Sequence, residues 1–207
     1  MLSNKIIRSL TLLSIFALLF GCGKTEQKKA NEGPVKNFND PVVMLQESKK
    51  VLGNDIKMAY SGMFEDTAKD EIVAAVEVDT KDELGIKFAL LKIIGNNLRK
   101  GFETGLLDGS ITNGYISKIK LPPTDYELLY YNSQDYYIGS RGGEVFSYII
   151  DFKLGKVYYA HLIIEPKMIS LFLSHNIENN EIKDFFIKNF KKDYPKFTLV
   201  SKDFILD

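Results

Sequence analysis

The sequence predicts an α+β fold in which a largely antiparallel meander sheet carries two or three helices packed on one face. Capped helix patterns lie near both ends of the region after residue 40. Between them, glycine-marked turns separate short runs rich in tyrosine and β-branched residues. The composition agrees with this fold, since 207 residues with 45% hydrophobic and 12% aromatic side chains can build a core.

The first helix is predicted to begin at Pro41. Asp40 can cap it, and proline at the first helical position loses no hydrogen bond, because the first N–H groups of a helix have no intrahelical partner. Gly53 ends the pattern. The apolar face expected to be buried is formed by Val42, Leu45 and Leu52.

Residues 72–78 are rich in β-branched side chains and predict a strand. The next segment, residues 81–104, can be a helix or a hairpin, and we favour the helix. Thr80 and Glu83 match a capping box, and an apolar stripe at helical spacing follows them. Three glycines favour the hairpin, since each would cost about 1 kcal/mol inside a helix. The stripe is Leu84, Phe88, Leu91, Leu98 and Phe102, and the glycines are Gly85, Gly95 and Gly101.

The meander follows Gly105, and its last run before the second helix covers residues 168–173. Asn179 or Asn180 can cap the second helix, acidic residues lie in its first turn, and Lys191 and Lys192 lie in its last turn. Its apolar face is Ile182, Phe185, Phe186 and Phe190. Pro195 breaks this helix, and residues 197–205 predict a closing strand.

The best candidate for catalytic chemistry is the hairpin over residues 144–164, which carries Ser147, Asp151 and His161. A three-residue loop over 153–155 would place Ser147 opposite His161. Asp151 would then lie four strand positions from Ser147, about 13 Å away at ~3.3 Å per residue. Because a triad needs two consecutive hydrogen bonds, this spacing excludes one. We predict no catalytic residue, and two histidines offer too few ligands for a metal site.

Nine of the eleven tyrosines lie between Tyr115 and Tyr159, several as adjacent pairs. Adjacent strand residues point to opposite faces, so we expect one ring of each pair to be exposed. Exposed tyrosines beside an arginine are typical of protein interfaces, although tyrosine also fits half-buried β surfaces without any function. The candidate partner-binding face is Tyr130, Tyr131, Tyr136, Tyr137, Arg141, Tyr158 and Tyr159.

The first residues combine Lys5 and Arg8 with an apolar run over residues 10–20, which is the layout of a secretory signal and is too short to span a membrane. The run ends in Leu19-Phe20-Gly21-Cys22, which resembles the lipobox of bacterial lipoproteins. The resemblance implies cleavage before Cys22, a thioether-linked diacylglycerol on its sulfur and an acyl chain such as palmitate on the new amino group.

We therefore expect a signal peptide over residues 1–21, the lipidated cysteine with a flexible tether over 22–39, and one globular α+β domain over 40–207. Removing the signal leaves 25 basic against 27 acidic residues. The expected location is the cell envelope, on the outer membrane facing the periplasm where there are two membranes. Apart from the covalent lipid, no cofactor is expected.

The balanced charge argues against nucleic acid as a partner, because neutralising phosphates needs a basic excess on one surface. The leading interpretation is a membrane-anchored, non-enzymatic module that binds another envelope protein, as an assembly factor, an inhibitor or an immunity protein would. A carrier of a small ligand or lipid is the alternative and needs an enclosed apolar pocket, and a hydrolase is the third. The sequence predicts no oligomeric state.

Overall fold

The computed structural model describes residues 35–136 and 142–200, which contain two helices and ten strands. The chain order is α2 (Pro41–Leu52), β1 (Ile56–Gly62), β2 (Glu71–Asp79), β3 (Leu84–Ile94), β4 (Asn97–Glu103), β5 (Gly114–Ile119), β6 (Leu128–Tyr136), β7 (Gly143–Asp151), β8 (Lys156–Ile164), β9 (Ile169–Leu173), α3 (Asn180–Asp193) and β10 (Thr198–Val200). The fold is mixed α+β and mostly sheet, which confirms the predicted class at that level.

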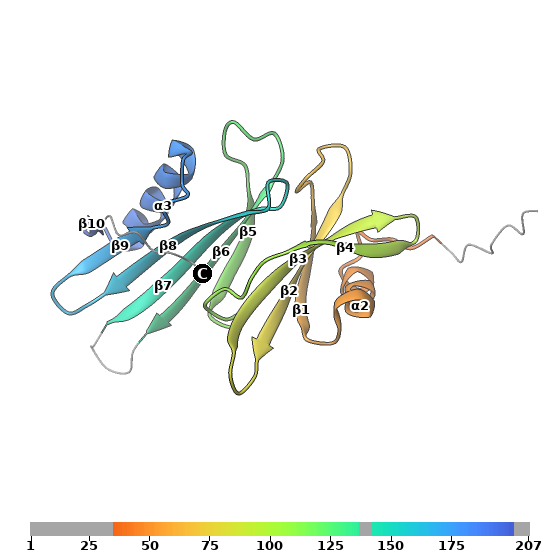
Figure 1. Cartoon of the computed structure of the whole chain (residues 1–207), viewed down its shortest axis with the longest axis horizontal. Helices are drawn as coiled ribbons and strands as arrows, with labels where there is room; N and C mark the ends of the chain where they lie inside the picture. Colours follow the sequence, from red (N-terminus) through yellow and green to blue (C-terminus); the bar gives the residue numbers. More distant parts are fainter. Residues whose placement is uncertain (1–34, 137–141, 201–207) are drawn as a thin grey trace, which may run out of the picture. The chain divides into compact units, whose positions relative to one another are not determined.

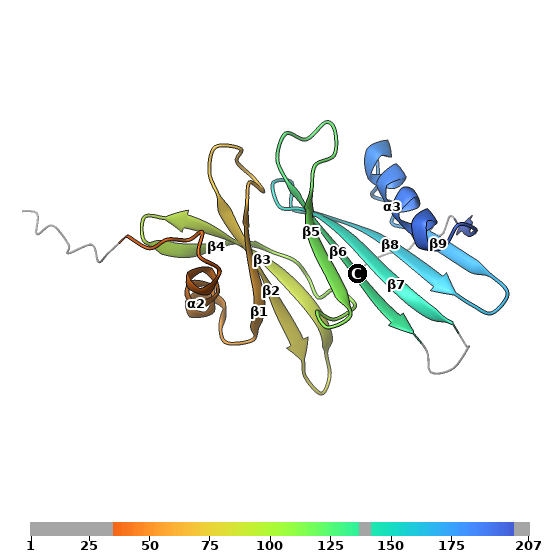
Figure 2. The same ribbon diagram turned by 180° about the vertical axis from the view of Figure 1, so that it is seen from behind.

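The strands form two sheets, whereas the sequence predicts one. Sheet A has the order β1-β2-β3-β4, and sheet B has the order β10-β9-β8-β7-β6-β5 (Figures 1 and 2). Neighbouring strands are antiparallel except for β10, which pairs in parallel with β9. The predicted closing strand over residues 197–205 corresponds to this short β10, and residues 201–207 lie outside the described part.

The segment over residues 81–104 is the β3–β4 hairpin, so the favoured helix was wrong. Glu83 N–H donates to the Thr80 hydroxyl at 3.0 Å, as it would in a capping box. Here, however, Thr80 N–H also donates to the Glu83 carbonyl, and the two bonds close the turn between β2 and β3. Gly95 has a φ of 59° as the first residue of the two-residue turn between Ile94 and Asn97. A hairpin turn of this kind favours glycine at that place.

Helix α2 begins as predicted, because the Asp40 carboxylate accepts hydrogen bonds from Val42 and Val43 N–H at 2.8 and 3.3 Å. The helix packs against β1, β2 and β4. Its buried residues are Met44 and Ser48, while Val42, expected in the buried face, is 61% exposed. Leu45 and Leu52 are partly buried against the same core, so two of the three predicted residues belong to the face that meets sheet A.

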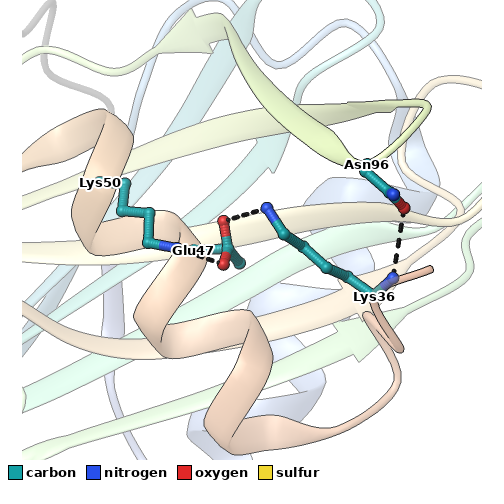
Figure 3. Close-up of polar contacts among 4 residues, drawn as sticks. All are labelled: Lys36, Glu47, Lys50 and Asn96. Atoms are coloured by element: carbon teal, nitrogen blue, oxygen red, sulfur yellow. Dashed lines mark hydrogen bonds and ion pairs between the residues drawn. The ribbon is translucent and has the colours of Figure 1, made fainter. Parts of the chain in front are cut away.

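Residues 36–39, assigned to the tether by the sequence analysis, contribute to the folded domain. Phe38 is buried in the core beneath α2. The Lys36 ammonium pairs with Glu47 at 2.9 Å, and Lys36 N–H donates to the Asn96 side chain at 3.2 Å. Lys50 also pairs with Glu47 (Figure 3). These contacts fix the start of the domain to both α2 and the β3–β4 turn.

A core between the sheets, here called the inter-sheet core, joins sheet A to sheet B. Phe88 of β3 contacts Tyr131 of β6 with ring centroids 5.3 Å apart. Tyr131 stacks on Tyr148 of β7 at 5.9 Å, and Tyr148 contacts Tyr159 of β8 at 5.0 Å. The opposite face of sheet B packs under α3 through the buried side chains of Ile182, Phe186 and Phe190. Both faces of sheet B are therefore covered.

Candidate binding sites at the two ends of helix α3

The tyrosine pairs alternate between the two faces of sheet B as predicted, but their rings are not exposed as expected. Tyr131 and Tyr159 belong to the inter-sheet core, and Tyr130 and Tyr158 belong to the core under α3. The four residues are at most 7% exposed. The face expected to meet solvent is covered by α3, because the buried side of this amphipathic helix lies on it.

The predicted face also includes Tyr136, Tyr137 and Arg141. Tyr137 and Arg141 lie outside the described residues, and Tyr136 is described only as the last residue of β6. Of the described tyrosines in the cluster, Tyr115 on the edge strand β5 is the exposed one, at 62%.

The β7–β8 hairpin has a register one residue away from the predicted register. Its loop contains four residues, 152–155, because Asp151 pairs with Lys156. The Asp151 carboxylate accepts the Leu154 N–H at 2.9 Å, and Gly155 has a φ of 62°. Ser147 consequently pairs with Ala160 rather than with His161.

The three residues of the rejected triad lie in three different environments. His161 pairs with Phe146 and faces the side of sheet B opposite to Ser147. Its Nε2 lies 3.0 Å from a Glu144 carboxylate oxygen, and its ring stacks on Phe146. Ser147 is fully buried under α3, and Asp151 is buried at the end of β7. The arrangement therefore offers no relay from Asp151 through His161 to Ser147.

Asp151 instead lines a cleft of about 480 Å³ at the N-terminal end of α3, here called the main cleft. The loop before β6, the β7–β8 loop and the first turn of α3 form its walls. Tyr126, Leu128, Tyr158 and Ile182 provide a largely apolar lining. Leu154, 57% exposed, lies at the cleft, and its backbone is held by the hydrogen bond to Asp151.

The charged groups that line the main cleft are mostly acidic. Its described lining includes Asp125, Asp151 and Glu178 against one base, Lys156. The Tyr126 hydroxyl donates to Asp151 at 2.8 Å. Burial raises the pKa of Tyr126, and the hydrogen bond to Asp151 raises it further. The Lys153 ammonium lies 4.6 Å from the centre of the Tyr126 ring, so the ring already serves as a cation-binding surface.

A second cavity, here called the α3 C-terminal cavity, has a volume of about 260 Å³. It lies between β5, β6 and β7 and the last turns of α3. Tyr115, Asn132 and Ser147 form one row across these strands, since Tyr115 pairs with Asn132 and Asn132 pairs with Ser147. Tyr130 lines the same cavity and meets Tyr115 edge to face at 6.4 Å.

The sequence indicates Tyr130 and Tyr158 as candidates but not the residues that accompany them in the linings of the two cavities. Tyr126 and Tyr115 belong to the same tyrosine cluster and could have been included on that signal. Asp151 was considered only as a catalytic partner. Its position at a loop start, where carboxylates accept backbone N–H bonds, was the available signal for its structural role.

In the described part of the chain, no three His, Cys, Asp or Glu side chains gather as a metal site would require. Neither helix in those residues is long and apolar enough to cross a membrane. Cys22, the expected lipid attachment site, lies outside the described residues. No protein-family model, curated protein or solved structure matches the chain.

Proposed function

We propose that the chain is a cell-envelope lipoprotein, anchored through lipid on Cys22, whose folded domain binds another envelope protein at the main cleft. The Leu19–Cys22 motif supports the anchor. The 12 residues between Cys22 and residue 35 can span at most about 40 Å, which would keep the domain near its membrane. Two or three acyl chains at about 0.8 kcal/mol per buried methylene would hold it there stably.

The observation that carries the binding proposal is the composition of the main cleft. Protein interfaces concentrate affinity in apolar and aromatic pockets that are surrounded by polar groups and that accept a side chain of the partner. The cleft has this composition, with Tyr126, Tyr158 and Ile182 inside and exposed Leu154 beside them. Its acidic excess favours a partner that presents a basic side chain.

The anchor is tested by replacing Cys22 with serine in cells that express the full chain. We expect the wild-type protein to incorporate labelled palmitate and to remain in the membrane fraction after alkaline extraction. We expect the Cys22→Ser variant to do neither. A wild-type protein with an unmodified thiol at position 22, or with residues 1–21 still attached, would contradict the anchor.

The binding proposal is tested by photo-crosslinking in the native envelope. A photoreactive phenylalanine analogue is placed at Leu154 and, as a matched control, at Met168, which is 51% exposed in the β8–β9 turn. We expect one discrete crosslinked protein from position 154, none from position 168, and loss of the adduct when Glu178, an exposed acidic residue of the cleft lining, is also replaced by lysine. Equal crosslinking at both positions, or none at 154, would contradict it.

A ligand carrier is the second candidate, and the α3 C-terminal cavity is the observation that favours it. This cavity has polar groups at its floor, whereas a lipid carrier would need an apolar enclosure. A co-purifying small molecule, recovered in the absence of any crosslinked protein, would favour this candidate over the first.

A further inference from the structure

We propose that the α3 C-terminal cavity binds a single neutral saccharide unit. The site is separate from the main cleft, and the two described linings share no residue. The inference is therefore independent of the protein-binding proposal. It rests on the polar and aromatic side chains that line the cavity and on the balance of charge around it.

The floor of the cavity carries polar side chains on an otherwise apolar face of sheet B. Tyr130 and Asn132 line it, and the Asn132 amide donates to the Ser147 hydroxyl at 2.6 Å. Ser147 is fully buried, and Tyr130 is 7% exposed. A tyrosine hydroxyl and a side-chain amide at a cavity surface can donate to ligand oxygens and accept from ligand hydroxyls.

The walls of the cavity suit a ligand with both hydroxyl groups and apolar C–H surfaces. Tyr115 presents its exposed ring at the mouth, and its edge-to-face contact with Tyr130 holds the two rings in a fixed arrangement. Asn132 and Asn189 carry side-chain amides, each of which can donate and accept hydrogen bonds. Neighbouring hydroxyl groups of a sugar need donors and acceptors of this mixed kind.

Charge and size restrict the ligand further. Among the described lining residues the charged pair is Lys192 and Asp193, whose charges cancel, so the site favours a neutral ligand. A volume of about 260 Å³ is below the range of ~300–1,000 Å³ usual for drug-sized ligands. One sugar ring is therefore a better fit than an oligosaccharide or an extended peptide.

The test is NMR titration of the isotope-labelled soluble domain, residues 35–207, with glucose, with N-acetylglucosamine and with trialanine as a neutral peptide. We expect saturable shifts of the Asn132 and Asn189 amides with one or both sugars at millimolar concentrations. Removing the ring in Tyr115→Ala, or one amide in Asn189→Ala, should weaken binding about tenfold. Tyr115→Phe keeps the ring and should weaken it less than threefold.

Leu154→Ala in the main cleft is the matched control and should bind the sugars as the wild type does. All variants are first checked for a native spectrum, and Tyr115 and Asn189 are not buried, so their truncation should leave the fold intact. Absence of saturable shifts with both sugars would overturn the proposal. So would binding that Tyr115→Ala leaves unchanged, or a preference for trialanine.

Discussion

Glu71 holds the loop after β1 through one carboxylate oxygen, which accepts N–H bonds from Phe64 at 3.1 Å and from Glu65 at 2.7 Å. Burial raises the pKa of Glu71, and these backbone bonds only partly oppose that effect. A raised pKa means that folding favours the protonated acid. The stability that comes with the protonated Glu71 side chain is present at low pH and is lost as pH rises through the pKa of this residue in the folded state.

We therefore expect Glu71→Gln to keep a side-chain oxygen that accepts the two N–H bonds. The variant should also remove the loss of stability with rising pH. Relative to this variant, the wild type should lose free energy of unfolding as pH rises from 4 to 7. Glu71→Ala leaves two N–H donors without their partner and should cost about 2–4 kcal/mol. Urea unfolding at several pH values measures both effects. Parallel pH profiles for the wild type and Glu71→Gln would contradict this account.

The β7–β8 hairpin shows how a single residue limits what can be predicted about a site from sequence. Strand positions and their alternation followed from residue types, and the separation of Asp151 from Ser147 followed from their spacing along one strand. The register did not, because a three-residue and a four-residue loop both fit the segment ending at Gly155. The four-residue loop is stabilised by the Asp151–Leu154 hydrogen bond, and the change of one residue moves His161 to the other face of the sheet.

Among the elements, both helices were predictable because their first turns carry side-chain caps. The β3–β4 hairpin was not, since the Thr80–Glu83 hydrogen bond is common to a helix start and to a tight turn. What decides between them is the pairing of β3 with the whole length of β2. That pairing depends on residues 71–79, which lie outside the segment over residues 81–104. The division of the strands into two sheets also depends on residues outside that segment.

Helix α3 supplies walls for both candidate sites, and its cap can be tested directly. The Asn179 oxygen accepts the Glu181 N–H at 2.9 Å, while its amide donates to the Pro122 carbonyl at 3.0 Å. Asn179→Ala should cost about 1 kcal/mol in free energy of unfolding. Asn179→Asp keeps the cap but loses the bond to Pro122, so a smaller loss is expected. Chemical denaturation measures both, and equal losses would show that the cap itself contributes nothing.

Helix α2 is tied to the start of the domain by Glu47, whose hydrogen bonds with Lys50 and Lys36 lower its pKa. A lowered pKa gives stability that is present above the unfolded-state value and lost as pH falls through the folded-state value. Glu47→Gln should therefore cost up to about 1 kcal/mol at pH 7 and progressively less on acidification. Thermal unfolding at pH 7 and pH 3 measures the cost of Glu47→Gln. The control is Glu103→Gln, which removes a carboxylate from the separate ion pair with Lys100. A loss that is constant with pH would contradict the ion-pair explanation.

Across the whole described domain, no strand of one sheet pairs with a strand of the other, but the two sheets share the inter-sheet core. Phe88 of sheet A and Tyr131 of sheet B are fully buried against each other. The Glu127 N–H also donates to the Met63 carbonyl, and the Glu127 carboxylate accepts the Met63 N–H. Neither sheet can lose its structure without exposing the apolar surface of the other, so we expect one cooperative unfolding transition.

The absence of tryptophan makes this expectation easy to measure, because near-ultraviolet signals come mainly from tyrosine and the tyrosines of the inter-sheet core belong to sheet B. Phe88→Ala removes a ring from sheet A and should cost about 3–5 kcal/mol. The near-ultraviolet and far-ultraviolet midpoints should fall together, since both sheets depend on that ring.

The control is Val42→Ala, at an exposed position of α2, which should change the free energy of unfolding by no more than about 0.5 kcal/mol. If Phe88→Ala shifted the far-ultraviolet transition and left the tyrosine signal at its wild-type midpoint, sheet B would be stable alone. The two α3 sites would then be independent of sheet A.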